Sequence, residues 1–98
     1  MIKATNLDLT EPLKVYIEEK LESLNRLLQG VDGDVVQARV EVARSTRHHR
    51  NGNVYHVDIN IDLPGKVLRA EEDAEDIRAA IDAVKDKLRV EIGKYKDK

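Results

Sequence analysis

The chain has 98 residues, a formal net charge of −2 at pH 7 and no cysteine. This length suits one domain with a single modest core. The lack of cysteine excludes a disulfide framework, a thiolate zinc site and a cysteine nucleophile. No apolar run approaches the roughly 20 residues that cross a bilayer, and no signal peptide is recognised. We therefore expect a soluble, intracellular protein without a membrane partner.

Charge is unevenly distributed along the chain. Residues 1–43 contain five basic and eight acidic residues, whereas residues 78–98 contain seven basic and four acidic ones. Residues 44–50 add three arginines, and residues 71–76 add five carboxylates. Exposed charges act over a Debye length of about 8 Å at physiological salt. The chain is therefore polarised rather than basic, and local patches are expected to decide what it binds.

The first half of the chain predicts a strand and a helix. Ile2 to Thr5 form a short first strand. Thr10 is suited to cap the following helix, and Pro12 fits its first turn. The apolar stripe of this helix has helical spacing and consists of Leu13, Tyr16, Ile17, Leu21, Leu24, Leu27 and Leu28.

The second half predicts three strands and a closing helix. Val36 to Val42 and Tyr55 to Leu63 alternate apolar and polar residues, as half-buried strands do. Pro64-Gly65 turns the chain into a last strand around Val67 to Glu71, and Asp73 is predicted to cap the closing helix. The apolar face of that helix contains Ile77, Ile81, Val84, Leu88, Ile92 and Tyr95.

Two turns predict how the strands pair. A two-residue hairpin turn at Asn51-Gly52 sets Val42 opposite Ile61, and the turn at Pro64-Gly65 sets Ile61 opposite Leu68. Both registers keep the apolar residues on one face. We therefore predict an α+β fold in the order β-α-β-β-β-α, with two helices packed on one face of a four-stranded sheet. Residues 1–98 form a single domain of this kind.

The other face of the sheet is predicted to be open and polar. It shows Gln37, Arg39, Glu41, Asp58, Asn60, Asp62 and Arg69. Sheets that bind single-stranded RNA stack bases on exposed aromatic residues, and this face has none. Any nucleic-acid contact is therefore expected from the helices and the hairpin, through phosphates and shape rather than base edges.

The closing helix carries cations on both sides of its apolar face. At 100° per residue they form two stripes: Arg78, Lys85, Arg89 and Lys96 along one edge, and Lys87, Lys94 and Lys98 near the other. Asp82, Asp86 and Asp97 fall mostly on the outer back. Two cationic stripes suit a phosphate-lined partner such as RNA. They equally suit a solvated helix face, because long basic stems cover apolar surface and pair with acids at i,i+3.

The predicted hairpin is a second candidate site. Its basic residues, suited either to gripping phosphate or to an ordinary polar tip, are Arg44, Arg47, His48 and Arg50. In the predicted register His48 faces Tyr55 while Arg47 faces His56, on opposite sides of the ribbon. The imidazoles then diverge, so we expect no metal site.

Catalytic constellations are not recognised. Ser23 and Ser45 lack a plausible triad setting, there is no glycine-rich phosphate loop, and Asp58 with Asp62 is typical of a solvated strand. We therefore predict that the protein is not an enzyme and uses no cofactor.

Several segments in one order resemble a known family. They are Thr10-Glu11-Pro12-Leu13-Lys14, Lys20-Leu21 with Leu24, Ala80-Ile81-Asp82, Asp86-Lys87-Leu88 and Lys94-Tyr95-Lys96. Together with the element order, they resemble the ribosome hibernation-promoting factors and ribosome-associated inhibitor proteins, once labelled sigma-54 modulation proteins. The likeness spans nearly the whole chain. Long members add a linker and a second domain, so the resemblance implies a short form or an N-terminal domain.

The resemblance implies a partner and a mechanism. Members bind the small ribosomal subunit and its 16S-type ribosomal RNA in the decoding channel, where they block messenger and transfer RNA and silence idle ribosomes. No DNA partner is implied. Matched by position, the implied RNA contacts are Lys14, Lys20, Lys87, Lys94, Lys96 and Lys98. The acidic run of residues 71–76 departs from the family's pattern.

Lys20 stands out on the first helix, because it projects within the apolar arc near Leu24 and Leu27. Such a lysine either snorkels or is positioned for a ligand, and the resemblance favours the ligand.

Two other functions remain open from the residues. One is a double-stranded-RNA-binding module, since the predicted layout is similar to such domains. The other is a structural protein that self-associates through its sheet face or edge, although the leading hypothesis requires no homo-oligomer.

Overall fold

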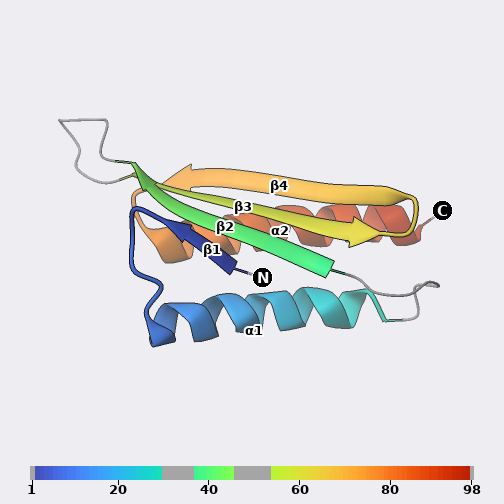
Figure 1. Cartoon of the computed structure of the whole chain (residues 1–98). Helices are drawn as coiled ribbons and strands as arrows, with labels where there is room; N and C mark the ends of the chain where they lie inside the picture. Colours follow the sequence, from blue (N-terminus) through green and yellow to red (C-terminus); the bar gives the residue numbers. More distant parts are fainter. Residues whose placement is uncertain (1, 30–36, 46–53, 98) are drawn as a thin grey trace.

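The computed structural model describes residues 2–29, 37–45 and 54–97. Within them the elements are β1 (Ile2–Thr5), α1 (Glu11–Leu27), β2 (Gln37–Ser45), β3 (Val54–Leu63), β4 (Lys66–Ala74) and α2 (Ile77–Lys96). The four strands form one sheet in the order β1-β2-β3-β4, with β1 parallel to β2 and the other neighbours antiparallel. Figure 1 shows α1 beside β1 and β2, while α2 packs against β3 and β4. The predicted fold class and element order are confirmed.

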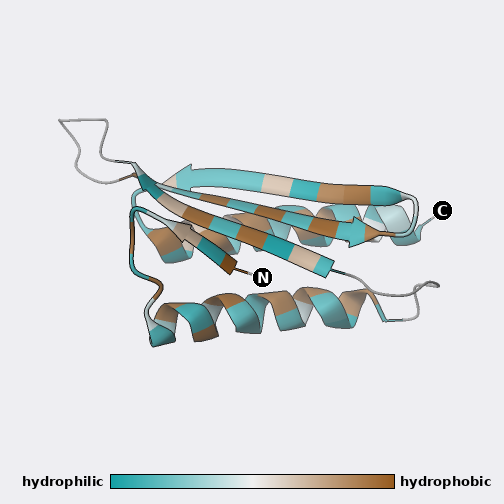
Figure 2. Ribbon diagram, in the orientation of Figure 1, coloured by the Kyte–Doolittle hydropathy of each residue, from teal (hydrophilic) through white to brown (hydrophobic). Residues whose placement is uncertain are grey.

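The core lies between the helices and one face of the sheet. Alternate residues of β2 and β3 point into it, which Figure 2 shows as alternating hydrophobic and hydrophilic bands. Burying a large aliphatic side chain contributes about 1.5–3 kcal/mol, so these residues fix which face the helices cover. The side chains buried most completely are Ile17, Leu24, Val42, Val57, Ile59, Ile61, Leu68, Ile81, Val84, Leu88 and Ile92.

The first helix begins where its sequence predicts. The Thr10 hydroxyl accepts a hydrogen bond from the Leu13 backbone N–H at 3.4 Å, and Pro12 lies in the first turn. Asn6 has a φ of +61°, a left-handed conformation that asparagine tolerates better than most residues. This residue helps to turn the chain from the end of β1 toward α1.

The predicted pairing of β2 with β3 is wrong. Val42 lies opposite Val57 rather than Ile61, and the last described pair is Ser45 with Val54. This register does not fit the two-residue turn predicted at Asn51-Gly52, and residues 46–53 themselves lie outside the described residues. Because the register moves by an even number of residues, every side chain keeps its predicted face.

Two pairings predicted for the hairpin histidines are wrong for the same reason. Tyr55 lies opposite Arg44 instead of His48, and His56 lies opposite Ala43 instead of Arg47. The register of β3 with β4 is confirmed, since Ile61 pairs with Leu68 across the turn at Pro64-Gly65.

The start of the closing helix also differs from the prediction. Asp76 is the N-cap of α2, and its carboxylate accepts from the Arg78 backbone N–H at 3.1 Å. Asp73 lies in β4, because that strand continues to Ala74 opposite Tyr55. In the part of the chain that the structure describes, no helix is long and apolar enough to cross a membrane.

Candidate nucleic-acid interface

The facing edges of α1 and α2 form a surface rich in cations, which we call the inter-helix surface. Contacts between the helices define both ends of it, at Tyr16 with Asp82 and at Leu27 with Lys96. Helical spacing between these ends places further residues on the same edges. The inter-helix surface thus consists of Tyr16, Lys20 and Leu27 from α1 with Arg78, Asp82, Lys85, Arg89 and Lys96 from α2. It carries five cations and one carboxylate.

One end of the inter-helix surface is organised around Tyr16. Its hydroxyl donates a hydrogen bond to Asp82 Oδ1 at 2.6 Å, and this bond raises the pKa of Tyr16 to about 12. The Lys20 ammonium lies 3.6 Å from the same oxygen and 4.8 Å from the centre of the Tyr16 ring. The Arg78 guanidinium lies 5.3 Å from that centre, within the range of a cation–π contact.

The other cations of the inter-helix surface have no carboxylate partner among the described residues. Lys96 donates to the Leu27 backbone carbonyl at 2.8 Å and has no carboxylate partner among the described residues. For Lys85 and Arg89, no hydrogen bond or ion pair occurs with any other residue in the described ranges. Lys85 is half-buried and Arg89 exposed. These cations are available to an anionic partner.

The opposite edge of α2, which we call the β4-facing edge, is different. Lys87 donates to the Glu71 backbone carbonyl at 2.9 Å and binds the Glu72 carboxylate. Lys94 lies 3.5 Å from Glu91. Both described lysines of this edge, Lys87 and Lys94, therefore already have a carboxylate partner within the protein.

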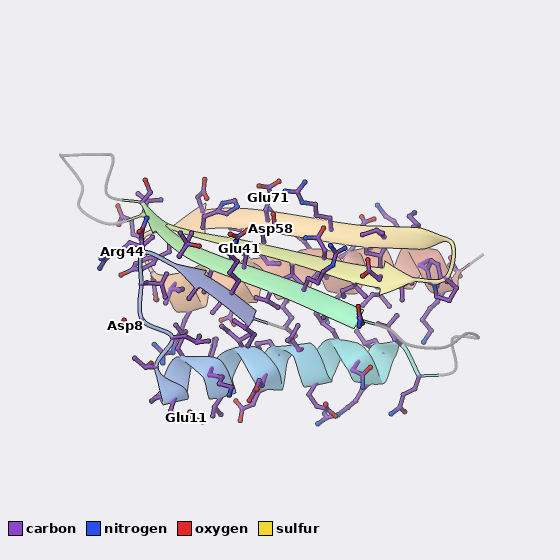
Figure 3. The ribbon with its side chains drawn as sticks, viewed as in Figure 1. Asp8, Glu11, Glu41, Arg44, Asp58 and Glu71 are labelled. Carbon is purple, nitrogen blue, oxygen red and sulfur yellow. The ribbon has the colours of Figure 1, made fainter. Side chains whose placement is uncertain are left out.

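Arg44 lies at the end of the molecule where both helices begin. It borders an open hollow of about 800 Å³ together with Asp8, Tyr55 and Ile77, and Figure 3 shows Arg44 and Asp8 at this end. The Arg44 Nε atom is buried and has no hydrogen-bond partner among the described residues. Arg47, His48, Arg50 and Lys98 lie outside the described residues.

The open face of the sheet is polar, as predicted, and its charges pair across strands. Arg39 binds Asp62 at 2.8 Å, and Arg69 binds Asp58 at 2.7 Å. The hydrogen bond to Asp58 raises the pKa of the Arg69 guanidinium. Figure 3 shows Glu41, Asp58 and Glu71 along β2, β3 and β4. These pairs leave the open face with few unpartnered cations.

One group on the open face has the residue types of a metal site. Ligand atoms of His56, Asp58 and Glu71 lie within 4.8 Å of one another. However, Arg69 contacts both carboxylates, and His56 Nδ1 is bonded to Asp73. The candidate ligand atoms of this group therefore already form ion pairs and hydrogen bonds with protein side chains. The sequence prediction treated Asp58 only as part of a solvated strand.

Comparison with known proteins places the chain in a family. The family model described as "Sigma 54 modulation protein / S30EA ribosomal protein" matches residues 1–98. The chain belongs to this family. The resemblance noted from the sequence is therefore confirmed.

Curated relatives include two proteins named "Ribosome hibernation promotion factor". The one from Deinococcus radiodurans is 34% identical over 97% of this chain and 47% of its own length. The one from Staphylococcus aureus is 32% identical over 97% of this chain and 46% of its own length. The chain thus spans about half the length of these relatives.

Solved structures agree with the fold. The Thermus thermophilus Protein Y N-terminal domain has a TM-score of 0.71 and 28% identity, covering 96% of this chain and 93% of that one. A structure titled as a ribosomal subunit interface protein from Coxiella burnetii has a TM-score of 0.66 and 24% identity, covering 99% and 98%. The second likeness concerns the fold alone.

The structure divides the family-matched lysines among three places. Lys20 and Lys96 lie on the inter-helix surface, whereas Lys87 and Lys94 lie on the β4-facing edge. Lys14 is exposed on the edge of α1 that faces away from α2, as its helical position relative to Tyr16 requires. The described cations of the two predicted stripes lie on opposite edges of α2. One edge faces α1, whereas the other faces the glutamates that pair with Lys87 and Lys94.

Asp82 is the residue that the sequence interpretation misplaced. It was assigned mostly to the outer back of the closing helix, whereas it bonds Tyr16 and Lys20 across the helix pair. Of the i,i+3 pairs expected in α2, the described residues show only Glu91 with Lys94. A signal for the Tyr16 contact did exist: a tyrosine at the border of an apolar stripe needs a partner for its hydroxyl.

Proposed function

We propose that this domain, residues 1–98, binds the small ribosomal subunit and silences translation. The proposed contact is made by the inter-helix surface with ribosomal RNA in the decoding channel, where messenger and transfer RNA otherwise bind. Such a role belongs in the cytoplasm. Family membership and the similarity to two ribosome hibernation promotion factors support a ribosomal partner.

The observation that carries the proposal is the arrangement of cations on two separate elements. Five basic side chains, from residues 20 to 96, line the facing edges of α1 and α2. Four of them lack a carboxylate partner among the described residues: Arg78, Lys85, Arg89 and Lys96. Basic side chains arranged in this way are suited to contact the phosphates of RNA. Arg44, Arg47, His48 and Arg50 are proposed to extend the contact beyond the helices.

The proposed mechanism is occlusion. A protein that fills the channel competes with messenger and transfer RNA for the same space, and no covalent change to the ribosome is required. Inhibition then scales with occupancy. It is complete near one protein per subunit, and excess transfer RNA or initiation factors reverse it.

Sedimentation of the protein with purified small subunits tests the proposal. We expect co-sedimentation that saturates near equimolar protein, falls steeply with salt and is reversed by transfer RNA. Bare duplex RNA serves as the comparison partner. Retention on duplex RNA with similar affinity indicates a general double-stranded-RNA module instead. Self-association without binding to either indicates a structural protein. Irreversible inactivation of ribosomes at substoichiometric protein indicates an enzyme.

A further inference from the structure

Asp82 is the single carboxylate among the residues that define the inter-helix surface. A carboxylate beside an RNA-binding row is expected to weaken binding, since it repels phosphate. Its contacts indicate another role. Both of its side-chain partners among the described residues, Tyr16 at 2.6 Å and Lys20 at 3.6 Å, come from α1. Asp82 therefore links the two helices at the place where their cations meet.

The Tyr16 ring extends this link to a second cation. Lys20 and Arg78 approach the ring centre to 4.8 and 5.3 Å. A fixed ring holds cations near it by cation–π attraction. Asp82 accepts a short hydrogen bond from the Tyr16 hydroxyl and so restricts the orientation of the ring. The arrangement runs from Asp82 through Tyr16 to one cation on each helix.

We propose that Asp82 and Tyr16 are positioning residues for RNA binding, which hold Lys20 and Arg78 in the geometry that phosphates require. This inference rests on the proposed function. Lysine and arginine lose rotamer freedom when they bind a phosphate, and side chains that are already held lose less. Asp82 then favours binding despite its charge, because it orders two cations while it repels one phosphate.

The substitution Asp82→Asn separates the two effects of this residue. It removes the negative charge and keeps an oxygen that accepts from Tyr16, but it loses the ion pair with Lys20. If only net charge matters, the variant binds small subunits more tightly than the wild type. If positioning dominates, it binds about threefold to tenfold more weakly, as expected when preorganisation is lost.

Asp86→Asn is the matched control. Asp86 is exposed on the same helix and makes no hydrogen bond or ion pair through its side chain in the described part of the chain. The variant therefore removes the same charge without disturbing the contacts of Asp82. We expect its affinity to equal or slightly exceed that of the wild type.

The salt dependence of binding distinguishes positioning from direct contact. Asp82→Asn keeps all five cations, so the slope of log K against log salt stays unchanged. Lys20→Ala removes one phosphate contact and lowers the slope by about 0.7–0.9. Tyr16→Phe keeps the ring but removes the hydroxyl, and we expect a loss of about twofold to fivefold with an unchanged slope. Thermal unfolding of each variant shows that it is folded at the assay temperature.

The outcomes are distinct. Wild-type protein that does not bind small subunits overturns the proposed function and this inference with it. Wild-type protein that binds, together with an Asp82→Asn variant that binds as tightly as Asp86→Asn, overturns the positioning role alone. If Asp82→Asn fails to fold, Tyr16→Phe decides: wild-type affinity for that variant overturns the inference, and weaker binding at the same slope supports it.

Discussion

The two edges of α2 carry the same residue types in different surroundings. On the β4-facing edge, Lys87 and Lys94 each have a glutamate partner within the protein. On the inter-helix surface, Lys85 and Arg89 have no such partner in the described ranges, and Lys96 is bound only by a backbone carbonyl. A cation that already has a counter-ion gains less from a phosphate, because the first interaction is lost or shared. The number of lysines on a helix edge is therefore a poor guide to its affinity for RNA.

Charge reversal on each edge gives the largest expected difference. Lys85→Glu with Arg89→Glu removes two available cations and adds repulsion, so we expect binding to small subunits to weaken by about 100-fold or more, roughly 3 kcal/mol. Lys87→Glu with Lys94→Glu is the matched pair, and we expect about tenfold, roughly 1.4 kcal/mol. Sedimentation at fixed salt measures both. Equal losses would remove the distinction between the edges.

The Tyr16–Asp82 hydrogen bond predicts a loss of stability at alkaline pH. The pKa of Tyr16 is raised to about 12, so its stabilising contribution is fully present below the ordinary tyrosine value of about 10. The contribution is lost as pH rises from about 10 through about 12, because the phenolate repels Asp82. We expect about 1 kcal/mol, since the site is partly solvated.

Chemical unfolding at pH 9 and pH 11.5 measures this effect, with Tyr16→Phe as the control. The difference in unfolding free energy between wild type and variant should narrow at the higher pH. A constant difference would contradict the assignment.

Removing the Glu72 carboxylate that pairs with Lys87 is expected to strengthen binding to small subunits. Glu72→Gln removes the carboxylate that binds Lys87, and we expect about threefold tighter binding, roughly 0.6 kcal/mol. Glu75→Gln changes the net charge equally, but Glu75 forms no hydrogen bond or ion pair with Lys87, so this variant is the matched control. Equal gains from both variants would attribute the effect to net charge rather than to the β4-facing edge.

Removal of a cation from the open sheet face gives the smallest expected effect. Arg39 is paired with Asp62 at 2.8 Å on the side of the sheet away from the helices. We expect Arg39→Gln to leave binding within about twofold, whereas Arg89→Gln weakens it by about fivefold, roughly 1 kcal/mol. Similar losses from the two variants would show that the open face also contacts the partner.

Much of the fold was predictable because its signals are local. Alternation from Val57 to Ile61 identifies a buried strand face, and the turn at Pro64-Gly65 sets the pairing of β3 with β4. The pairing of β2 with β3 was not predictable in the same way, because the observed register does not fit the turn predicted at Asn51-Gly52. The faces were still assigned correctly, since the shift of register is even.

The candidate site was predictable only in part. Helical spacing placed Lys85 and Arg89 on one edge of α2 and Lys87 on the other. The partners of these residues depend on how far β4 extends and on how the two helices meet. The contact of Asp82 with Tyr16, 66 residues earlier in the chain, is such a long-range outcome. Sequence periodicity determines which side of a helix a residue occupies, but it does not determine which residues of other elements face that side.

The parallel pairing of β1 with β2 carries a consequence for the synthesis of the protein. It makes α1 a crossover between the two strands, while the other half of the inter-helix surface comes from α2 near the far end of the described chain. A nascent chain that has emerged only as far as β4 holds α1 without its facing helix. By our proposal, such a chain lacks most of the phosphate-binding row. By the same proposal, the protein does not gain its full RNA-binding surface until α2 has been translated and has docked.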